Sequence, residues 1–207
     1  MMILLNNKLN DFIKNLVKLE IPEKRKAILH LLIDYIHHKL IEDKEVNLNF
    51  ICTHNSRRSQ FSQIWGYTAA AYYGIKVNCY SGGTEVTAIN ERVLTSIKRK
   101  GFFVTSVNSS NSIYKVAYNN EVQPLIVYSK IFDDQINKTN KFAAVMNCTN
   151  ADENCPYIPK SEKRISIQYK DPKIFDNTPL ETKKYEECSL KIASELFYVF
   201  RKVSENI

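Results

Sequence analysis

The middle of the chain alternates short apolar runs with helical patterns, and this alternation restricts the fold more than any other feature. A β run at 46–51 leads into the polar segment CTHNSRRS, and a helix follows at about 59–73. A second β run at 77–80 precedes a helix at 90–100, and residues 102–107 again favour a strand. Such alternation is typical of a parallel sheet with helices on its faces. We therefore expect a three-layer α/β/α fold around a mostly parallel four-stranded sheet, with the loops after the strands at one edge.

The first 45 residues predict two helices that form an appendage to the main domain, residues 46–207. Apolar residues recur at helical spacing in the first helix, and Pro22 is a favourable first residue for the second. Two such helices cannot bury their apolar faces on each other alone. We expect them to pack on the main domain or to form a homodimer with a second subunit.

Residues 108–140 interrupt the alternation, and we interpret them as an insertion. Within them, the runs 113–118 and 125–128 flank Asn119-Asn120 and predict a β-hairpin. After the insertion, the apolar run 142–146 predicts a buried strand. Residues 164–168 alternate like one more strand, and residues 181–203 predict a long final helix with one apolar stripe.

Composition and charge exclude several classes of protein. The chain has 207 residues with 29 Lys and Arg against 22 Asp and Glu, a formal net charge of +7, and only 5 glycines and 6 prolines. It is therefore neither collagen-like nor a Pro/Gly-rich disordered chain. No apolar run reaches the roughly 18 residues of a membrane-spanning helix, and the N-terminus does not resemble a signal peptide, so we expect a cytoplasmic protein without membrane contact. The odd number of cysteines, 5, argues against a secreted disulfide scaffold and favours catalytic or redox thiols.

The strongest local signal is a C-x5-R-S segment that runs from Cys52 to Ser59, between a strand and a helix. Successive amides at a helix N-terminus form an anion-binding nest, and their field favours the thiolate of a cysteine. Cys52 is then a nucleophile towards a tetrahedral oxyanion, which Arg58 can hold through two of its oxygens. Asn55 suits a left-handed turn within the loop, and Ser59 can donate to the thiolate or cap the helix. The residues that we expect to bind the oxyanion are Thr53, His54, Asn55, Ser56, Arg57 and Ser59.

The segment FICTHNSRRSQ resembles the signature loop of the low-molecular-weight protein tyrosine phosphatases and of the thioredoxin-coupled arsenate reductases related to them. Residues 81–102 resemble the strand, loop and helix that follow in that superfamily. Asp171-Pro172 lies where the superfamily has its general acid, so the resemblance implies that Asp171 gives a proton to the leaving group. An Asp in a closed anion site is suited to that role.

A second pair of cysteines, Cys148 and Cys155, is separated by six residues. In a helix the two would lie about 10 Å apart along the axis, too far for a disulfide, which needs Cα atoms within about 7 Å. The residues between them are mostly poor helix formers, so the segment should unwind readily. The pair resembles the redox segment of the thioredoxin-coupled arsenate reductases, which implies that both thiols take part in the reaction. Zinc needs more ligands than the sequence offers here, so we expect neither a metal site nor a cofactor.

The resemblance implies a cysteine-dependent enzyme that acts on a small oxyanion, arsenate or phosphate. Our first expectation is an arsenate reductase in which Cys52, Cys148 and Cys155 pass a disulfide along for thioredoxin to reduce. The alternative is a phosphatase that hydrolyses phosphotyrosine or other phosphate monoesters through a phosphocysteine. A non-catalytic, nucleic-acid-binding module is less favoured, because the basic residues are scattered rather than gathered in a stripe. Two residues depart from the usual loop: His54 replaces a glycine, and Arg57 replaces a second cysteine found in many relatives.

Overall fold

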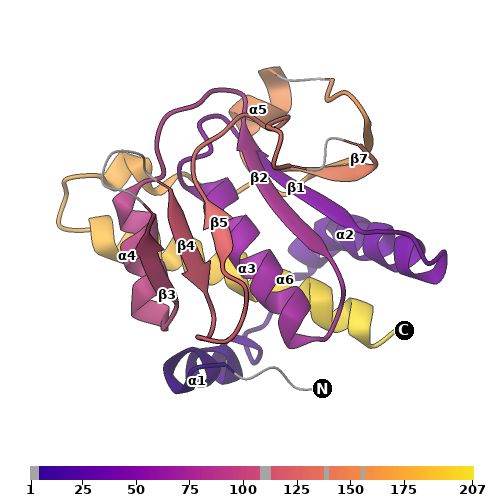
Figure 1. The fold of residues 1–207 in the computed structure, drawn as a ribbon, viewed down its shortest axis with the longest axis horizontal. Helices are drawn as coiled ribbons and strands as arrows, with labels where there is room; N and C mark the ends of the chain where they lie inside the picture. The colour runs from indigo at the N-terminus through magenta and orange to yellow at the C-terminus, as the bar shows by residue number, and fades with distance from the viewer. Residues whose placement is uncertain (1–4, 108–112, 138–139, 155–156) are drawn as a thin grey trace.

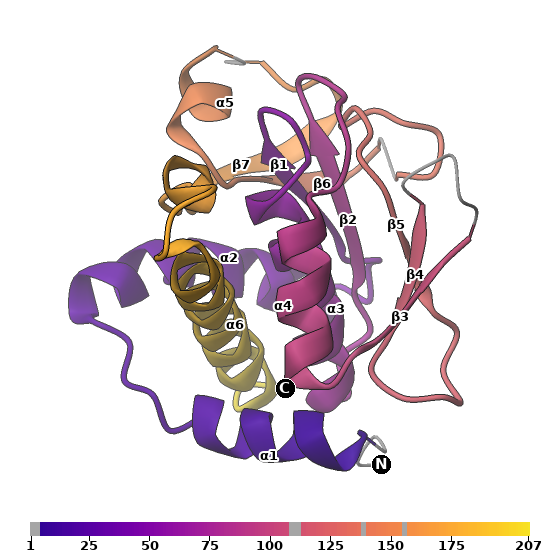
Figure 2. The same ribbon diagram turned by 90° about the vertical axis from the view of Figure 1, so that its left-hand side faces the viewer.

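The computed structural model describes residues 5–107, 113–137, 140–154 and 157–207, and it is built around a parallel sheet (Figures 1 and 2). Within these residues the sheet has four strands in the order β2-β1-β6-β7, all parallel to their neighbours. Their bounds are Asn47–Cys52 for β1, Asn78–Gly83 for β2, Phe142–Met146 for β6 and Ser161–Ser166 for β7. The expected α/β fold with a mostly parallel sheet is confirmed.

Alternate residues of β1 point into two different cores, as the period of a strand requires. Leu48 and Phe50 lie in the larger core, which the sheet shares with the long helices α3 (Arg58–Tyr72) and α6 (Glu181–Ser204). Ile51 faces the opposite side and packs in a smaller core with residues of β6 and of the short helix α5 (Thr149–Asn154). Cys52, the last residue of β1, departs from this alternation, because it also belongs to the smaller core.

A second sheet is antiparallel and contains the expected hairpin. Its strands are β3 (Phe103–Ser106), β4 (Tyr114–Ala117) and β5 (Leu125–Val127). The strand at 103–106, expected from the strand–helix alternation, pairs with β4 rather than with the parallel sheet. Its side chains explain the difference, because Phe103, Thr105 and Ser106 are exposed and a strand buried between helices needs apolar residues on both faces.

The chain returns from the antiparallel sheet along the end of β2, where two glycines permit a close approach. The amide of Gly83 donates to the carbonyl of Lys130 (2.8 Å), and the amide of Phe132 donates to the carbonyl of Gly83 (3.0 Å). A Cβ atom on Gly82 would lie 2.2 Å from Cα of Phe132, and one on Gly83 would lie 2.6 Å from the carbonyl oxygen of Thr53. Only glycine fits at these positions, and the return segment is thereby fixed beside the loop that follows Cys52.

The two N-terminal helices, α1 (Asn7–Leu16) and α2 (Glu23–Ile41), pack against the rest of the chain. Their apolar residues, among them Leu9, Ile13, Leu29 and Leu32, are buried in the larger core. This is the first of the two arrangements expected from the sequence. The helix α4 (Glu91–Lys100) begins at the N-cap Asn90 and ends at Gly101, whose φ of 105° is in the left-handed region.

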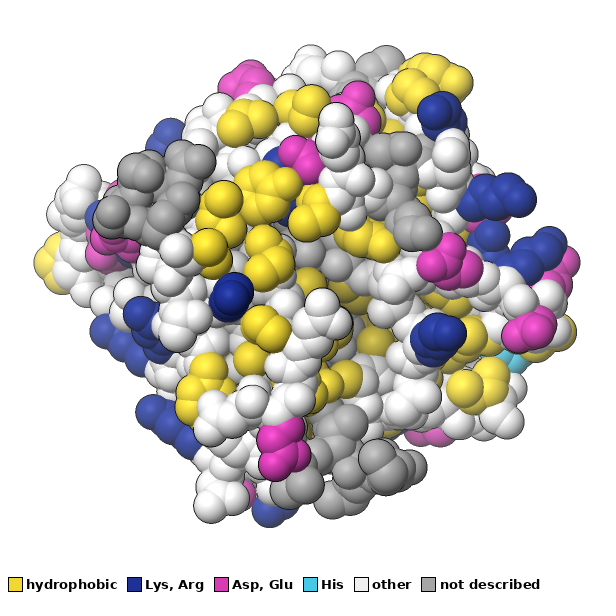
Figure 3. Space-filling model, in the orientation of Figure 1, with side chains coloured by type: hydrophobic (Ala, Val, Ile, Leu, Met, Phe, Trp, Pro, Cys, Tyr) yellow, Lys and Arg dark blue, Asp and Glu magenta, His cyan; other side chains and the backbone are white. Residues whose placement is uncertain are grey.

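The surface agrees with the scattered charge pattern of the sequence. On the face shown in Figure 3, apolar side chains gather near the centre while Lys and Arg side chains are dispersed towards the rim. None of the helices formed by the described residues is long and apolar enough to cross a membrane.

Candidate active site

The loop after β1 turns sharply between the end of the sheet and the start of α3. Cys52 is the last strand residue and is 3% exposed, and Arg58 is the first residue of α3. Between them Asn55 has a φ of 45°, the left-handed conformation expected for it. The loop residues therefore curve around a single point at the carboxyl end of the sheet.

The buried side chain of Asn55 holds this curved loop together. Its Nδ2 donates to Oγ of Ser59 (2.8 Å), and its Oδ1 accepts from Nε2 of Gln60 (3.0 Å) and from the amide of Lys130 (3.0 Å). Gln60 also donates to the carbonyls of Asn55 (2.9 Å) and Tyr128 (2.8 Å). The loop is thus bonded to α3 on one side and to the return segment of the antiparallel sheet on the other.

Ser59 lies within hydrogen-bond distance of Cys52 at the start of α3. The Oγ atom of Ser59 lies 3.0 Å from Sγ of Cys52, and both residues are buried. Because this oxygen already accepts from Asn55, its own hydrogen is free to point at the sulfur. A hydrogen bond to the charged form of a nucleophile favours that form.

Asp171 lies across the loop, where two arginines hold it. Nη2 of Arg58 is 2.6 Å from Oδ2 of Asp171, and Nε of Arg57 is 3.0 Å from Oδ1. Asp171 also caps the short helix η1 (Pro172–Phe175), because its Oδ1 accepts from the amide of Lys173 (3.0 Å). Arg58 is oriented from behind by the carbonyl of Tyr169, which accepts from Nη1 (3.1 Å). Arg58, the last residue of the C-x5-R segment that begins at Cys52, is therefore in direct contact with Asp171.

Cys148 reaches the same loop from the other side. Its Sγ lies 3.4 Å from Oγ1 of Thr53 and 3.4 Å from the amide of Ala151, and the residue is 1% exposed. Thr53 also donates to Oδ1 of Asn150 (3.1 Å), so the loop and α5 are in direct contact. Cys155 lies outside the described residues.

The helix α5 is attached to β7 through Asp152. Its carboxylate accepts from Nη2 of Arg164 (2.8 Å), from Oγ of Ser166 (2.5 Å) and from Nε2 of Gln168 (2.9 Å). Burial acts to raise the pKa of Asp152, but the hydrogen bonds from Ser166, Gln168 and Arg164 outweigh it and lower the pKa below its usual value.

Two other cysteines remain apart from the loop chemistry. Burial raises the pKa of Cys79 well above its usual value, and Cys79 packs in the larger core. Cys188 on α6 is close enough to Arg58 and Asp171 to sense their charges, yet burial raises its pKa to about 12. Both are therefore neutral thiols near neutral pH, as the sequence favours.

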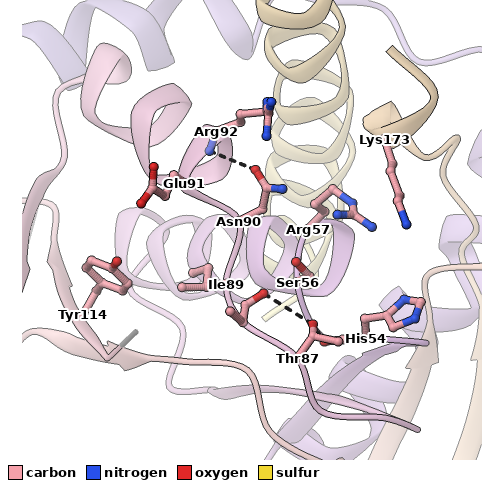
Figure 4. A pocket seen from close by; sticks show the side chains of 11 residues that line it. His54, Ser56, Arg57, Thr87, Ile89, Asn90, Glu91, Arg92, Tyr114 and Lys173 are labelled. Carbon is pink, nitrogen blue, oxygen red and sulfur yellow. Dashed lines mark hydrogen bonds between the residues drawn. The ribbon is translucent and has the colours of Figure 1, made fainter. Parts of the chain in front are cut away.

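A cavity of about 530 Å³ opens beside the loop (Figure 4). The side chains of His54, Arg57 and Lys173 lie at one end of it, and Tyr114 from the antiparallel sheet lies at the other. Nε2 of His54 is 3.3 Å from Oε2 of Glu85. The cavity therefore lies between the loop, α4, η1 and the antiparallel sheet.

Several residues that shape the site do not stand out in the sequence. Ser129 donates to the carbonyl of His54 (2.9 Å), and the amide of Lys130 holds Asn55. Burial lowers the pKa of Lys130 to about 8. Both residues belong to the predicted insertion. They reach the loop because the chain passes beside it after β5, a path that the sequence does not reveal. Only the Gly82-Gly83 pair offers a sequence signal for that approach.

No group of three or more His, Cys, Asp or Glu side chains is arranged to hold a metal ion within the part of the chain that the structure describes.

Comparison with known proteins gives two related findings, although no protein-family model matches the chain. Arsenate reductase 2 of Staphylococcus haemolyticus is 30% identical over 123 residues, which cover 59% of this chain and 76% of that protein. Arsenate reductase 1 of Staphylococcus saprophyticus is 29% identical over a stretch of the same length and coverage.

Among solved structures, an arsenate reductase in the phosphate binding state superposes with a TM-score of 0.51 at 14% identity, covering 76% of this chain and 98% of that chain. The structural likeness supports the assigned fold, and the sequence matches support a common family with these arsenate reductases. The chain belongs to the low-molecular-weight protein tyrosine phosphatase superfamily, the group that includes these arsenate reductases, and it is a cysteine-dependent enzyme that acts on oxyanions.

Proposed function

We propose that this protein is an arsenate reductase that uses a relay of thiols. One observation carries the proposal: a second buried thiol, Cys148, lies against the loop that contains the nucleophile, with its Sγ 3.4 Å from Oγ1 of Thr53. A phosphatase needs only one thiol at its loop, because water completes its reaction. The arsenate reductases to which the chain is similar add support from the sequence.

In the first step, the thiolate of Cys52 attacks the arsenic atom of arsenate held by the loop amides and Arg58. A sulfur–arsenic bond forms, an arsenic–oxygen bond breaks, and the oxygen leaves as water after protonation, with Asp171 at hand to assist. Successive donors aimed at one oxyanion stabilise the charge that develops on it. Ser59 stabilises the attacking thiolate through the hydrogen bond described above.

In the second step, the thiolate of Cys148 attacks the sulfur of Cys52. The new disulfide forms while the sulfur–arsenic bond breaks, and its electron pair remains on arsenic, which leaves as arsenite. Cys155 then attacks Cys148 and frees Cys52, and a thioredoxin-type dithiol supplies two electrons to reduce the Cys148–Cys155 disulfide. Each exchange is favoured by the proximity of the reacting groups.

The experiment compares single cysteine variants in a thioredoxin-coupled arsenate assay. We expect Cys52→Ser and Cys148→Ser to lose at least 100-fold in turnover (roughly the value of a properly placed reacting group). Cys188→Ser is the matched control, because this thiol is near Arg58 and Asp171 but outside the relay, and it should retain activity. Wild-type turnover by Cys148→Ser would rule the scheme out.

The cavity beside the loop favours a second candidate, hydrolysis of phosphate monoesters. Its volume of about 530 Å³ is in the range of pockets that take small organic molecules. A free oxyanion needs far less room. Hydrolysis of an aryl phosphate that requires Cys52, Arg58 and Asp171, but neither Cys148 nor Cys155, would select the phosphatase.

The thiol relay also bears on the cellular compartment and on the partner of the protein. Reduced thiols persist in the cytoplasm, so we propose that compartment, and thioredoxin as the partner that reduces the enzyme. The division into a helical extension and a main domain stays a prediction, as does a homodimer through the N-terminal helices. Sedimentation of the purified chain would test the homodimer.

A further inference from the structure

Lys130 is a buried cation that the chemistry described so far does not use. It is 2% exposed, and its Nζ forms no ion pair with a carboxylate of the residues that the structure describes. The side chain instead turns back along the chain, where Nζ lies 3.5 Å from the carbonyl oxygen of Tyr128 and 4.5 Å from the centroid of the Tyr128 ring. Burying a charge without a paired counter-charge costs free energy, so this ammonium group needs a reason to be there.

Two groups of Lys130 meet the hydrogen bonds that shape the loop after Cys52. Its amide donates to Oδ1 of Asn55 (3.0 Å), and its ammonium faces the carbonyl of Tyr128, which also accepts from Nε2 of Gln60 (2.8 Å). Gln60 in turn donates to the carbonyl of Asn55 (2.9 Å) and to its Oδ1 (3.0 Å). The contacts of Nζ thus run through Tyr128 and Gln60 to Asn55 in the loop.

We propose that the ammonium group of Lys130 is a tethered cation that fixes the loop for oxyanion binding and favours the negative charge of the bound oxyanion. A cation buried behind the loop acts more strongly than one in water, because little solvent screens it. Lys130 is a positioning residue in this scheme, because it acts through Tyr128 and the hydrogen bonds of Asn55. The inference concerns any oxyanion that the loop binds, so it goes beyond the proposed reduction of arsenate.

Lys130 differs in its titration from the groups that face it. Burial lowers the pKa of Lys130 to about 8, although the nearby charge of Asp134, which accepts from the hydroxyl of Tyr128 (2.9 Å), acts to raise it. Tyr67 on α3 and Tyr80 on β2 line the same cavity, and burial raises the pKa of each of these two tyrosines, and of Tyr128, to about 12. The other described residues that line the cavity are uncharged. In mildly alkaline solution, therefore, the ammonium loses its proton while the tyrosines around it stay neutral.

Loss of this proton has opposite effects on stability and on binding. The pKa of Lys130 is about 8 in the folded chain, below the model value of 10.5, so the unfolded chain holds the proton more readily. The free energy of unfolding therefore rises with pH between these two values. Over the same interval the loop loses its cation, so its affinity for an oxyanion falls. A side chain that served only to pack the interior would change stability and binding in the same direction.

The test measures binding of inorganic phosphate to the full chain and to Lys130→Met by calorimetry, from about pH 7 to about pH 10. We expect Lys130→Met to bind phosphate about tenfold more weakly at the lower pH, which is the size expected for one hydrogen bond from a charged group. Towards the higher pH the two affinities should converge. Their ratio removes the ionisation of phosphate and of Cys52, which both proteins share. Lys130→Arg stays charged throughout and should keep its affinity to the end of the range.

A free cation should replace the tethered one in a truncated variant. Lys130→Ala leaves a space that opens into a cavity of about 240 Å³ beside α3. Ammonium or methylammonium ions should strengthen phosphate binding by this variant severalfold. Tetramethylammonium at the same ionic strength has no N–H group to donate and should not. Lys115→Met is the matched control, because it removes an exposed cation from β4 in the neighbouring sheet, and it should bind phosphate like the wild type.

The outcomes separate this inference from the proposed function. Equal phosphate affinities of Lys130→Met and the wild type near neutral pH overturn the inference, as does an affinity ratio that stays constant over the whole pH range. Absence of phosphate binding by the wild type overturns it too. Absence of arsenate reduction by a wild type that binds phosphate overturns the proposed function and leaves the phosphate comparison to judge Lys130. If thermal unfolding shows that Lys130→Met does not fold, Lys130→Gln carries the same comparison.

Discussion

At the scale of single residues, Asn55 connects the loop to α3 and to the returning segment near Lys130. It combines a left-handed backbone with three side-chain hydrogen bonds, to Ser59, Gln60 and Lys130. Through Ser59 it also directs the hydrogen that stabilises Cys52. The geometry of the loop therefore depends on the buried amide side chain of Asn55.

We expect Asn55→Ala to lower the free energy of unfolding by about 2–3 kcal/mol, because it strands buried donors and acceptors. Turnover should fall as well, since Ser59 loses its partner. Asn177→Ala is the matched control: Asn177 also has a positive φ, 62°, but it is exposed and lies far along the chain from the loop. Urea unfolding and an activity assay check both variants, and equal losses in the two would contradict a special role for Asn55.

At the scale of elements, α5 is a short helix that the carboxylate of Asp152 attaches to β7 and the residues after it. Its sequence, TNADEN, is poor in helix formers, so its own propensity does little to keep it folded. Instead Asp152 bonds it to Arg164, Ser166 and Gln168 on and after β7. This attachment keeps Cys148 buried beside Thr53, and it must loosen if Cys148 is to reach a more distant thiol.

Asp152→Asn should therefore expose Cys148 without disturbing the loop. We expect alkylation of Cys148 by iodoacetamide to speed up about tenfold, measured by mass spectrometry against Cys79 in the same sample. Glu153→Gln is the control, because it removes a neighbouring exposed carboxylate from the same helix. Identical labelling rates in the two variants would show that Asp152 does not hold the helix.

The secondary-structure elements also show which parts of the fold could be predicted from sequence patterns. The order of strands and helices follows from local patterns. The contact between Arg58 and Asp171 is compatible with the same patterns, because parallel strands put their following loops at one edge. The alternation predicts a parallel strand at 102–107, but the exposed residues of β3 suit the antiparallel sheet in which it lies. The roles of Lys130 and Ser129 could not be predicted, since they depend on where a returning chain passes Gly83 and leave no periodic signal.

At the scale of the whole molecule, Arg25 links the start of α2 to Glu195 in the interior of α6. It donates to both oxygens of Glu195 (2.7 and 2.8 Å) and to the carbonyl of Gln168 (3.1 Å), and its guanidinium lies 5.1 Å from the ring centroid of Tyr169. Glu195 is 2% exposed. The N-terminal helices are therefore fixed to the main body by a buried ion pair as well as by apolar contact.

Arg25→Ala leaves the buried carboxylate of Glu195 without its cation, which costs roughly 3–5 kcal/mol for such a pair. We expect a loss at the lower end of that range in urea unfolding, because Tyr169 remains as a neighbour. Lys24→Ala, which removes an exposed cation from the adjacent position of α2, should change stability by less than about 0.5 kcal/mol. A loss of similar size in both variants would argue against the ion pair.

The position of Arg25 has a consequence for how much of this chain an engineer could discard. Tyr169, whose ring lies beside Arg25, is the residue whose carbonyl orients Arg58. A shortened chain without α2 would keep the loop and Arg58 but would lose the contact of Arg25 with Tyr169, whose carbonyl bonds Arg58. We expect such a truncation to bind arsenate or phosphate more weakly than the full chain, so the smallest unit that works is larger than the set of residues that do the chemistry.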